Sequence, residues 1–298
     1  MWCVTEVRVR LTLPLPTGPR VKAIKSTPFF SIQVVMREMS LGEWEILLKP
    51  CLGKGRIMNL MVWLGWIVRR EAELLSPPVE FLFLFPFLII MNIIVWNCRG
   101  ALKPNFQSHV RDLVRIHNPS ILVVMETRVG GDRAKEIINR LPFDGFIFTD
   151  TLGFAGGIWL LWNSDRVEVV PLATTEQEIH AEVKVLPSNL AWIFTAVYAS
   201  PRIVERRVLW DNLTKVADLH RKPWIIAGDF NEPLVGDDKF GGRPVNINRA
   251  LMFKDCLDKC NIVDMGFNRS RYTWTNRREI HSLIQERIDR FFMNPSWC

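Results

Sequence analysis

The sequence predicts an α/β protein in which two packed mixed β-sheets are covered by outer helices. Three observations favour this class: apolar runs of strand length that end in polar residues, segments of alternating strand pattern, and amphipathic segments of helix length between them. With 298 residues, of which 48% are hydrophobic, the chain is long enough for one large domain or for two.

Helices and strands are expected to alternate along residues 91–298. Helices are predicted where apolar residues recur at helical spacing, at 106–117, 133–141, 205–220 and 249–260. Strands are predicted at 92–97, 121–126, 158–162, 167–171, 178–186, 191–198, 225–231, 262–265, 272–275 and 284–292. Between them, residues 236–244 are expected to form an exposed loop around Gly241 and Gly242.

The segment I-I-A-G-D-F-N-E at 225–232 predicts a buried strand with Asp229 and Asn231 at its end. Because strand side chains alternate between faces, these two project to one side and Phe230 to the other. An acid and an amide on rigid backbone can orient a water, a metal or a phosphate oxygen. The alternative is an ordinary strand end, where Asp and Asn commonly form an Asx turn.

Two further predicted strands end in polar side chains. Asn97 follows the apolar run 93–96, and Glu126 follows the apolar run 121–125. A carboxylate at the end of a strand that is covered on both faces needs a reason to be there. Together with Asp229 and Asn231, these residues predict one site at the sheet edge. Carboxylate and amide oxygens without a His or Cys cluster suit a hard cation, Mg²⁺ or Mn²⁺.

Six motifs follow one another in a specific order: W-N-C-R-G, V-M-E-T-R, V-Y-A-S-P, A-G-D-F-N-E, R-Y-T-W-T-N and E-R-I-D-R. With them the chain resembles the endonuclease/exonuclease/phosphatase superfamily, and within it the apurinic-type endonuclease domain of plant LINE-type (non-LTR) retrotransposons. The resemblance covers residues 91–298. It implies a four-layer sandwich of two packed mixed β-sheets with outer helices, here lacking its C-terminal end, and cleavage of DNA phosphodiesters with Mg²⁺.

The resemblance also implies roles for residues on the metal and phosphate side of the site. Glu126 matches the glutamate that binds the divalent metal, and Asn97 matches the asparagine beside that metal and the scissile phosphate. Tyr198, in V-Y-A-S-P, matches the tyrosine that contacts the phosphate.

The other matches concern proton transfer. Asp229 matches the aspartate that handles the proton of the attacking water or leaving oxygen, and Asn231 matches its hydrogen-bonding neighbour. Asp289, in E-R-I-D-R, matches the aspartate that orients a catalytic histidine.

Two departures from the family pattern bear on activity. The family's histidine lies in a Ser-Asp-His motif some tens of residues after E-R-x-D, whereas this sequence ends at Cys298. None of the five histidines is expected to replace it: His109, His117, His180, His220 and His281. Arg99 stands where many relatives place an acid or an amide, so either fewer groups bind the metal or Arg99 faces phosphate.

The resulting expectation is an Mg²⁺-dependent DNA endonuclease domain that is impaired by the absence of the Ser-Asp-His segment. One alternative is an inactive relic with at most weak nucleic-acid binding. A less favoured alternative is a phosphatase of the same superfamily acting on lipid or inositol phosphates, which W-N-C-R-G and Y-T-W-T-N-R-R argue against.

Composition constrains the partners and the compartment. More than half of the formal net charge of +7 lies in residues 1–90, so charge alone does not identify a DNA-binding protein. DNA is the partner that the resemblance implies, and no stable protein partner is implied. The six cysteines include no C-x-x-C pair, and Cys256 and Cys260 are expected to pack on a helix. An intracellular, reducing location, nuclear or cytoplasmic, is expected.

Residues 1–90 contain none of the motifs and no sustained periodicity, and they are expected to form a poorly structured appendage before the domain at 91–298. The chain begins without the apolar core of a signal peptide. The apolar segment 57–68 is too short to span a bilayer, and the segment 81–96 is interrupted by Pro86 and Asn92. A membrane anchor is therefore not favoured.

Overall fold

The computed structural model describes residues 2–12, 29–39, 88–151, 156–186, 188, 190–267 and 271–297. The chain divides into two compact units, of which the first comprises residues 1–11, 30–39 and 89–298. Almost all described residues belong to this first unit, which contains both large sheets and all four α-helices described below.

The first sheet is mixed and has six strands in the order β2-β1-β3-β4-β6-β5. β3 and β4 run parallel, whereas β6 is antiparallel to both β4 and β5. All five residues of β4 are buried, as expected for an apolar strand that is covered on both faces. The strand bounds are β1 (Trp2–Thr12), β2 (Phe29–Met39), β3 (Leu88–Asn97), β4 (Ile121–Met125), β5 (Gly145–Phe148) and β6 (Ile158–Trp162).

The second sheet is also mixed, with six strands in the order β12-β15-β10-β9-β8-β7. β9 and β10 run parallel, and the other neighbouring strands are antiparallel. The strand bounds are β7 (Val167–Thr174), β8 (Glu178–Val185), β9 (Leu190–Tyr198), β10 (Trp224–Asp229), β12 (Val263–Asp264) and β15 (Asp289–Met293).

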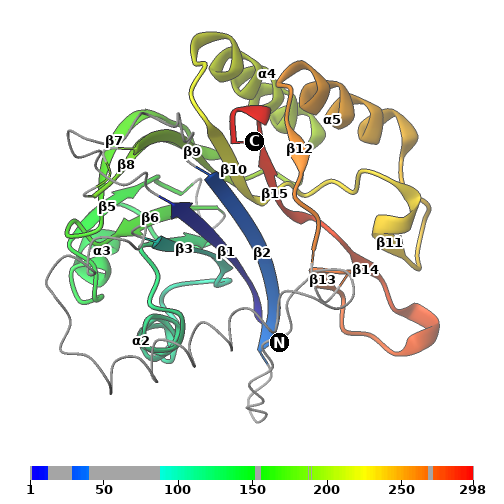
Figure 1. Cartoon of the computed structure of the whole chain (residues 1–298). Helices are drawn as coiled ribbons and strands as arrows, with labels where there is room; N and C mark the ends of the chain where they lie inside the picture. The colour runs from blue at the N-terminus through cyan, green and yellow to red at the C-terminus, as the bar shows by residue number, and fades with distance from the viewer. Residues whose placement is uncertain are drawn as a thin grey trace, which may run out of the picture. The chain divides into compact units, whose positions relative to one another are not determined.

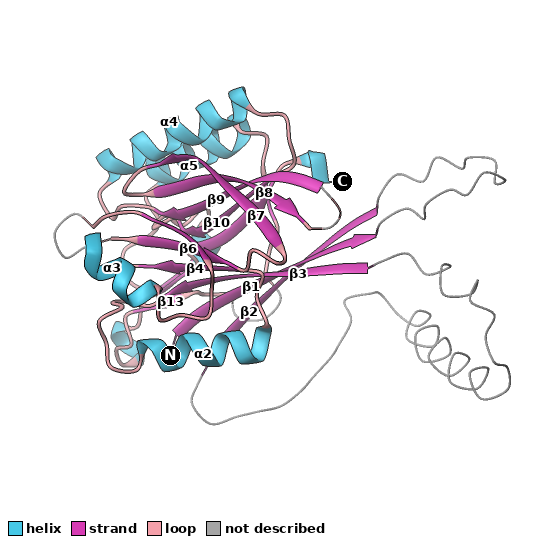
Figure 2. Cartoon of the chain, turned by 90° about the vertical axis from the view of Figure 1, so that its left-hand side faces the viewer, coloured by secondary structure: helices cyan, strands magenta, loops and turns pink. Residues whose placement is uncertain are grey.

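Three apolar clusters join the sheets and helices into four layers. The central cluster lies between the sheets and includes Val123 of β4, Phe194 of β9 and Ile225 of β10. A second cluster packs α2 (Phe106–His117) and α3 (Gly131–Ile138) on the first sheet, and a third packs α4 (Ile203–Leu219) and α5 (Ile247–Lys259) on the second. Figures 1 and 2 show the helices outside the two sheets. The predicted α/β four-layer architecture is confirmed.

A third, three-stranded sheet was not expected from the sequence. It consists of β11 (Lys239–Phe240), β14 (Gln285–Glu286) and β13 (Trp274–Thr275) in that order. The single strand predicted at 284–292 is therefore wrong, because β14 belongs to this sheet whereas β15 pairs with β10 in the second. The backbone N–H of Arg287, between the two strands, donates to the carbonyl of Asp238 at 2.8 Å, outside both large sheets.

Part of the region 1–90 contributes to the first sheet. β1 lies beside β3, and β2 lies beside β1 at the edge of the sheet. These strands do not match the expected appendage, but residues 13–28 and 40–87 lie outside the described residues. The domain boundary at residue 90 therefore stays a prediction. The apolar segment 57–68 lies outside the described residues as well. Among the helices that the structure describes, none has the length and apolar character needed to cross a bilayer.

Gly228 lets β10 pass close to β9. Its φ is 152°, and a Cβ at this position would lie 1.8 Å from the carbonyl oxygen of Val197. We expect Gly228→Ala to destabilise the protein by about 3 kcal/mol, because a rigid backbone neighbour must move to admit the methyl group. Urea unfolding would measure the change.

Gly236→Ala is the matched control, because a Cβ at Gly236 would meet nothing within 4 Å. Its effect should stay within about 0.5 kcal/mol. Equal urea midpoints for the two variants would contradict the predicted clash.

Candidate active site

The strand ends that carry the six predicted site residues lie in register. In the first sheet, Asn97 at the end of β3 pairs with Met125, which directly precedes Glu126. In the second sheet, Asp229 at the end of β10 is flanked by Tyr198 of β9 on one side and by Asp289 of β15 on the other. Each sheet therefore presents polar side chains at one edge.

The two edges meet. The side chain of Asn97, from the first sheet, lies close enough to the carboxylate of Asp229, from the second, to lower its pKa. Glu126 lies close enough to raise the pKa of Asp229 electrostatically. The structure thus brings the six predicted residues together, while the roles assigned to them stay predictions.

The backbone leaves the strand directly after Asp229. Asn231 has a φ of 47°, its backbone N–H donates to Asp229 Oδ1 at 2.9 Å, and its Nδ2 donates to the carbonyl of Ala199 at 2.7 Å. The predicted strand end at 231 is therefore two residues too late, because the Asp side chain forms an Asx turn. Phe230 is fully buried and stacks against Trp210 and Phe253. The turn fixes both polar side chains at the site.

Strained backbone is concentrated at this site. Arg99, Glu126, Arg128 and Asn231 all lie in the left-handed region, with φ values of 52°, 54°, 58° and 47°. Left-handed conformations are uncommon for residues other than glycine and persist where the surrounding structure demands them. Four such residues beside three strand ends support a functional role for this edge.

Burial and charge shift the pKa values of two polar groups of the site, Asp229 and Tyr198. The pKa of Asp229 is raised well above its usual value, first by burial and then by the neighbouring carboxylates Asp289 and Glu126. Burial, followed by Glu126 and Asp229, also raises the pKa of Tyr198, against the opposing effect of Arg128 and Arg99. The Tyr198 hydroxyl therefore keeps its proton at neutral pH and can donate a hydrogen bond.

The donor set fits Mg²⁺ in its chemistry. Glu126, Asp229 and Asp289 place three carboxylates in one neighbourhood, and their mutual repulsion on Asp229 is a charge excess that a cation would relieve. Among the described residues, no three His, Cys, Asp or Glu side chains are gathered closely enough to form a metal cage. Mg²⁺ does not need one, because it usually binds one or two carboxylates together with substrate phosphate and water.

Sequence reasoning assigned no role to two sets of charged residues. Arg128, the last residue of V-M-E-T-R, forms an ion pair with Glu126. Arg206 and Glu232 form a buried ion pair at 2.5 Å, and Arg206 Nη1 also donates to the carbonyl of Ser200 at 2.7 Å. Their signal in the sequence was weak: an arginine two residues after Glu126, and a glutamate directly after Asn231.

The chain's five histidines are all among the described residues, and they lie on one helix, at the end of another, on one strand and in one exposed turn. His109 and His117 lie on α2, and His220 is the C-cap of α4. His180 is buried with its Nδ1 2.8 Å from Thr195 Oγ1, and His281 is exposed beside Glu279.

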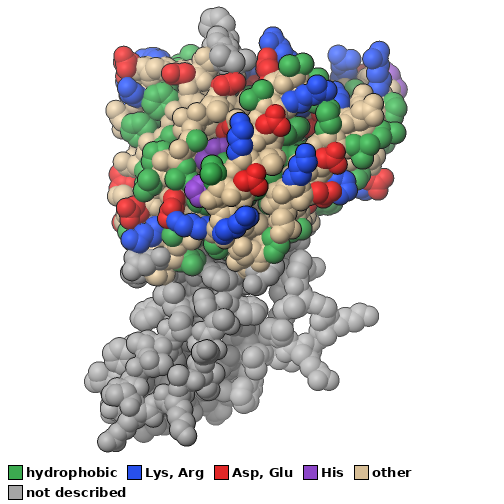
Figure 3. Space-filling view, turned by 90° about the horizontal axis from the view of Figure 1, so that it is seen from above, with side chains coloured by type: hydrophobic (Ala, Val, Ile, Leu, Met, Phe, Trp, Pro, Cys, Tyr) green, Lys and Arg blue, Asp and Glu red, His purple; other side chains and the backbone are tan. Residues whose placement is uncertain are grey.

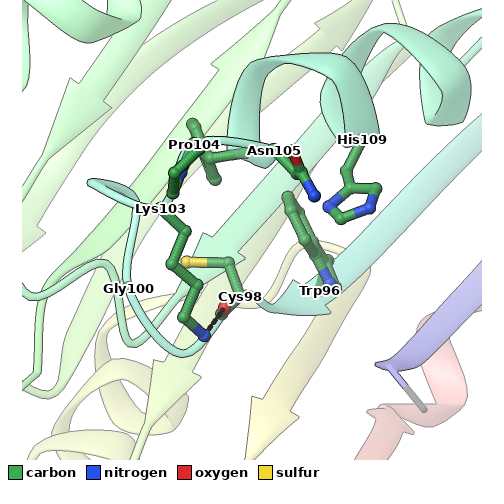
Figure 4. A pocket seen from close by; sticks show the side chains of 8 residues that line it. Trp96, Cys98, Gly100, Lys103, Pro104, Asn105 and His109 are labelled. Carbon is green, nitrogen blue, oxygen red and sulfur yellow. Dashed lines mark hydrogen bonds between the residues drawn. The ribbon is translucent and has the colours of Figure 1, made fainter.

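A cavity of about 240 Å³ lies next to the site but contains none of its six residues. It is lined by Trp96, Cys98, Gly100, Lys103, Pro104, Asn105, Phe106 and His109. Figure 4 shows Lys103 reaching back to the carbonyl of Cys98, at 3.4 Å. Burial raises the pKa of the Cys98 thiol to about 12, so this cysteine is not a nucleophile at neutral pH.

Charged side chains of both signs are mixed on the face seen in Figure 3, and no large basic patch covers it. Binding of nucleic acid on that face by charge alone is therefore not indicated.

Comparison with known proteins agrees with the fold. Residues 94–298 match the family model described as the endonuclease/exonuclease/phosphatase family. No curated protein sequence matches the chain. The solved structures of similar fold include the AP endonuclease LMAP from Leishmania major and the endonuclease domain of TRAS1, a telomere-specific non-LTR retrotransposon.

The likeness to these structures is in fold and not in sequence. The Leishmania enzyme has a TM-score of 0.56 and 15% identity, over 68% of this chain and 79% of the other. The TRAS1 domain has a TM-score of 0.50 and 13% identity, over 68% of this chain and 84% of the other. Because the family model covers most of the sequence, the chain belongs to the endonuclease/exonuclease/phosphatase family.

Proposed function

We propose that this chain is an Mg²⁺-dependent endonuclease domain that cleaves DNA phosphodiesters and derives from a non-LTR retrotransposon. The observation that carries the proposal is the meeting of two sheet edges at Asn97, Glu126, Tyr198, Asp229 and Asp289. The family supplies the reaction class, hydrolysis of a phosphate ester. The motif W-N-C-R-G and the fold of the TRAS1 domain support the retrotransposon origin.

The side chains of the site suit in-line attack on a phosphodiester. Glu126 and Asn97 would hold the cation, which stabilises negative charge on the transferring phosphoryl group. Tyr198 donates a hydrogen bond to a phosphate oxygen, since its hydroxyl stays protonated. Asp229 moves the proton of the attacking water or leaving oxygen, and Asn231 is held beside it through Ala199.

We propose further that the activity is impaired. By the family resemblance, the aspartate matching Asp289 orients the histidine of a Ser-Asp-His motif, and the described part of the chain contains no such motif. Removing one preorganised group from such a site typically lowers the rate by about a hundredfold or more. An inactive relic that retains weak nucleic-acid binding is the second candidate, favoured by this observation.

We expect slow nicking of supercoiled plasmid and of abasic-site duplex DNA with Mg²⁺, and EDTA should stop it. No phosphate should be released from inositol phosphates by the same preparation. DNA binding without nicking, with protein in excess over DNA, would favour the relic. Release of inorganic phosphate from an inositol phosphate would instead favour a phosphatase.

A further inference from the structure

Arg128 forms an ion pair with the glutamate that would bind the metal. Its Nε donates to Glu126 Oε1 at 3.1 Å, and its Nη2 contacts the same oxygen. Both residues follow β4 in left-handed backbone, with φ of 54° for Glu126 and 58° for Arg128. In this left-handed segment, the side chain of Arg128 turns back to pair with that of Glu126.

This pairing opposes cation binding in the free protein. A carboxylate oxygen that already accepts from a guanidinium has less capacity for a metal ion. The guanidinium charge also repels a divalent cation at the same carboxylate. Glu126 therefore binds Mg²⁺ less readily while Arg128 is paired with its Oε1.

Arg128 is able to move. Its side chain is 49% exposed, whereas that of Glu126 is 15% exposed. Ion pairs that are open to solvent contribute little to stability, so a competing anion can separate them. The ion pair of Arg206 and Glu232 differs, because both side chains are buried and fixed.

A phosphate bound at Tyr198 would be a new partner for the displaced guanidinium. Arg128 and Arg99 are both close enough to Tyr198 to lower its pKa, against the larger opposing effects of burial and the carboxylates. A phosphate that accepts a hydrogen bond from Tyr198 would lie within the field of both arginines. Arginine binds phosphate through parallel hydrogen bonds, which suits the transfer.

We propose that Arg128 is the counter-ion of Glu126 in the free protein and transfers to a DNA phosphate when substrate binds, which releases Glu126 for the divalent cation. Cation and DNA then bind with positive coupling, and the free protein is protected from loading metal without substrate. This inference rests on the proposed function, because it requires that Glu126 binds the cation and that the phosphate belongs to DNA.

The test is Mn²⁺ binding to the whole chain, followed by the electron paramagnetic resonance signal of free Mn²⁺, with and without an uncleavable phosphorothioate duplex. The wild-type protein should bind Mn²⁺ about tenfold more tightly when DNA is present, a coupling of ordinary size. Arg128→Gln should bind Mn²⁺ tightly without DNA and lose the coupling. Arg128→Lys, which keeps the cation, should stay closer to the wild type.

Arg133→Gln is the matched control, because Arg133 forms an exposed ion pair with Glu136 at 2.7 Å on the outer helix α3. It should behave as the wild type. Equal Mn²⁺ affinity of wild type and Arg128→Gln without DNA would overturn the role of Arg128 but leave the proposed function standing. Failure of both proteins to bind Mn²⁺, with or without DNA, would overturn the metal-dependent function and with it the inference.

Discussion

Replacing Asp229 by asparagine is expected to lower the rate of Mg²⁺-dependent DNA nicking by about a thousandfold, the midrange effect of losing a general acid or base. Asparagine keeps an oxygen that can accept from the Asn231 N–H, the contact that closes the turn after β10. It cannot take up a proton. Because the wild-type rate is expected to be low, single-turnover nicking with excess protein is the suitable measurement.

Although Asp229→Asn should nick DNA more slowly, its folded state should be at least as stable as that of the wild type. The pKa of Asp229 is raised in the folded chain, whereas in the unfolded chain it is near 3.9. Between these two pKa values the folded chain keeps a proton on Asp229 that the unfolded chain has released. The folded state therefore loses stability as pH rises from the unfolded pKa towards the folded one, and that loss persists above the folded pKa. An asparagine side chain does not ionise, so Asp229→Asn should unfold at an equal or higher urea concentration than the wild type at pH 7.

The exposed Asp211 on α4 provides the control. Asp211→Asn should leave both nicking and stability unchanged, since surface substitutions typically change stability by less than about 0.5 kcal/mol. Wild-type nicking rates in Asp229→Asn would contradict the role assigned to Asp229. Loss of both activity and stability would indicate that the carboxylate is needed for folding instead.

The positions of Asn97, Glu126 and the Asp229/Asn231 pair could be predicted because they follow apolar runs, whereas Tyr198 and Asp289 were indicated only by the resemblance of their motifs. The run 121–125 is buried along its whole length, so its end marks where Glu126 reaches the sheet edge. The register of parallel strands then places Asn97 and Tyr198 at matching edges. Periodicity determines where a strand ends, and a strand end determines where a polar side chain is presented.

Strand partners and side-chain ion pairs could not be predicted in this way. The segment 284–292 has a continuous strand pattern, but β14 and β15 pair with different sheets, and nothing local indicates the change of partner. The ion pair of Arg128 with Glu126 depends on left-handed backbone at both residues, which is unusual for either residue type. The partner of Glu232 lies 26 positions away, on α4.

Removal of the Glu232 carboxylate is expected to destabilise the protein by about 4 kcal/mol, because it leaves the buried guanidinium of Arg206 without its counter-ion. Arg206 is 0% exposed and Glu232 is 2% exposed, and burial is the main cause of the lowered pKa of Arg206. In Glu232→Gln, the carbonyl of Ser200 still accepts from Arg206 Nη1 but carries no full charge. Urea unfolding at pH 7 would measure the loss.

Removal of the arginine of this ion pair should destabilise the protein less than removal of the glutamate. In Arg206→Met, Glu232 keeps a second cation, because Arg249 Nε donates to the same carboxylate oxygen at 2.9 Å. We expect this variant to lose about 3 kcal/mol, the lower limit for breaking a buried ion pair. Arg202→Gln on the same helix removes an exposed pair with Glu205 at 3.0 Å and should cost no more than about 1 kcal/mol.

The order of stability loss among these three variants tests whether the buried ion pair stabilises the protein. The ion pair joins the residue after Asn231 to the carbonyl of Ser200, two residues after Tyr198, so its loss should also loosen the site. Small displacements of catalytic groups lower rates strongly. Folded Glu232→Gln protein should therefore nick DNA more slowly than Arg202→Gln at a temperature where both are native. Equal stability of Glu232→Gln and Arg202→Gln would show that the buried charges are compensated in another way.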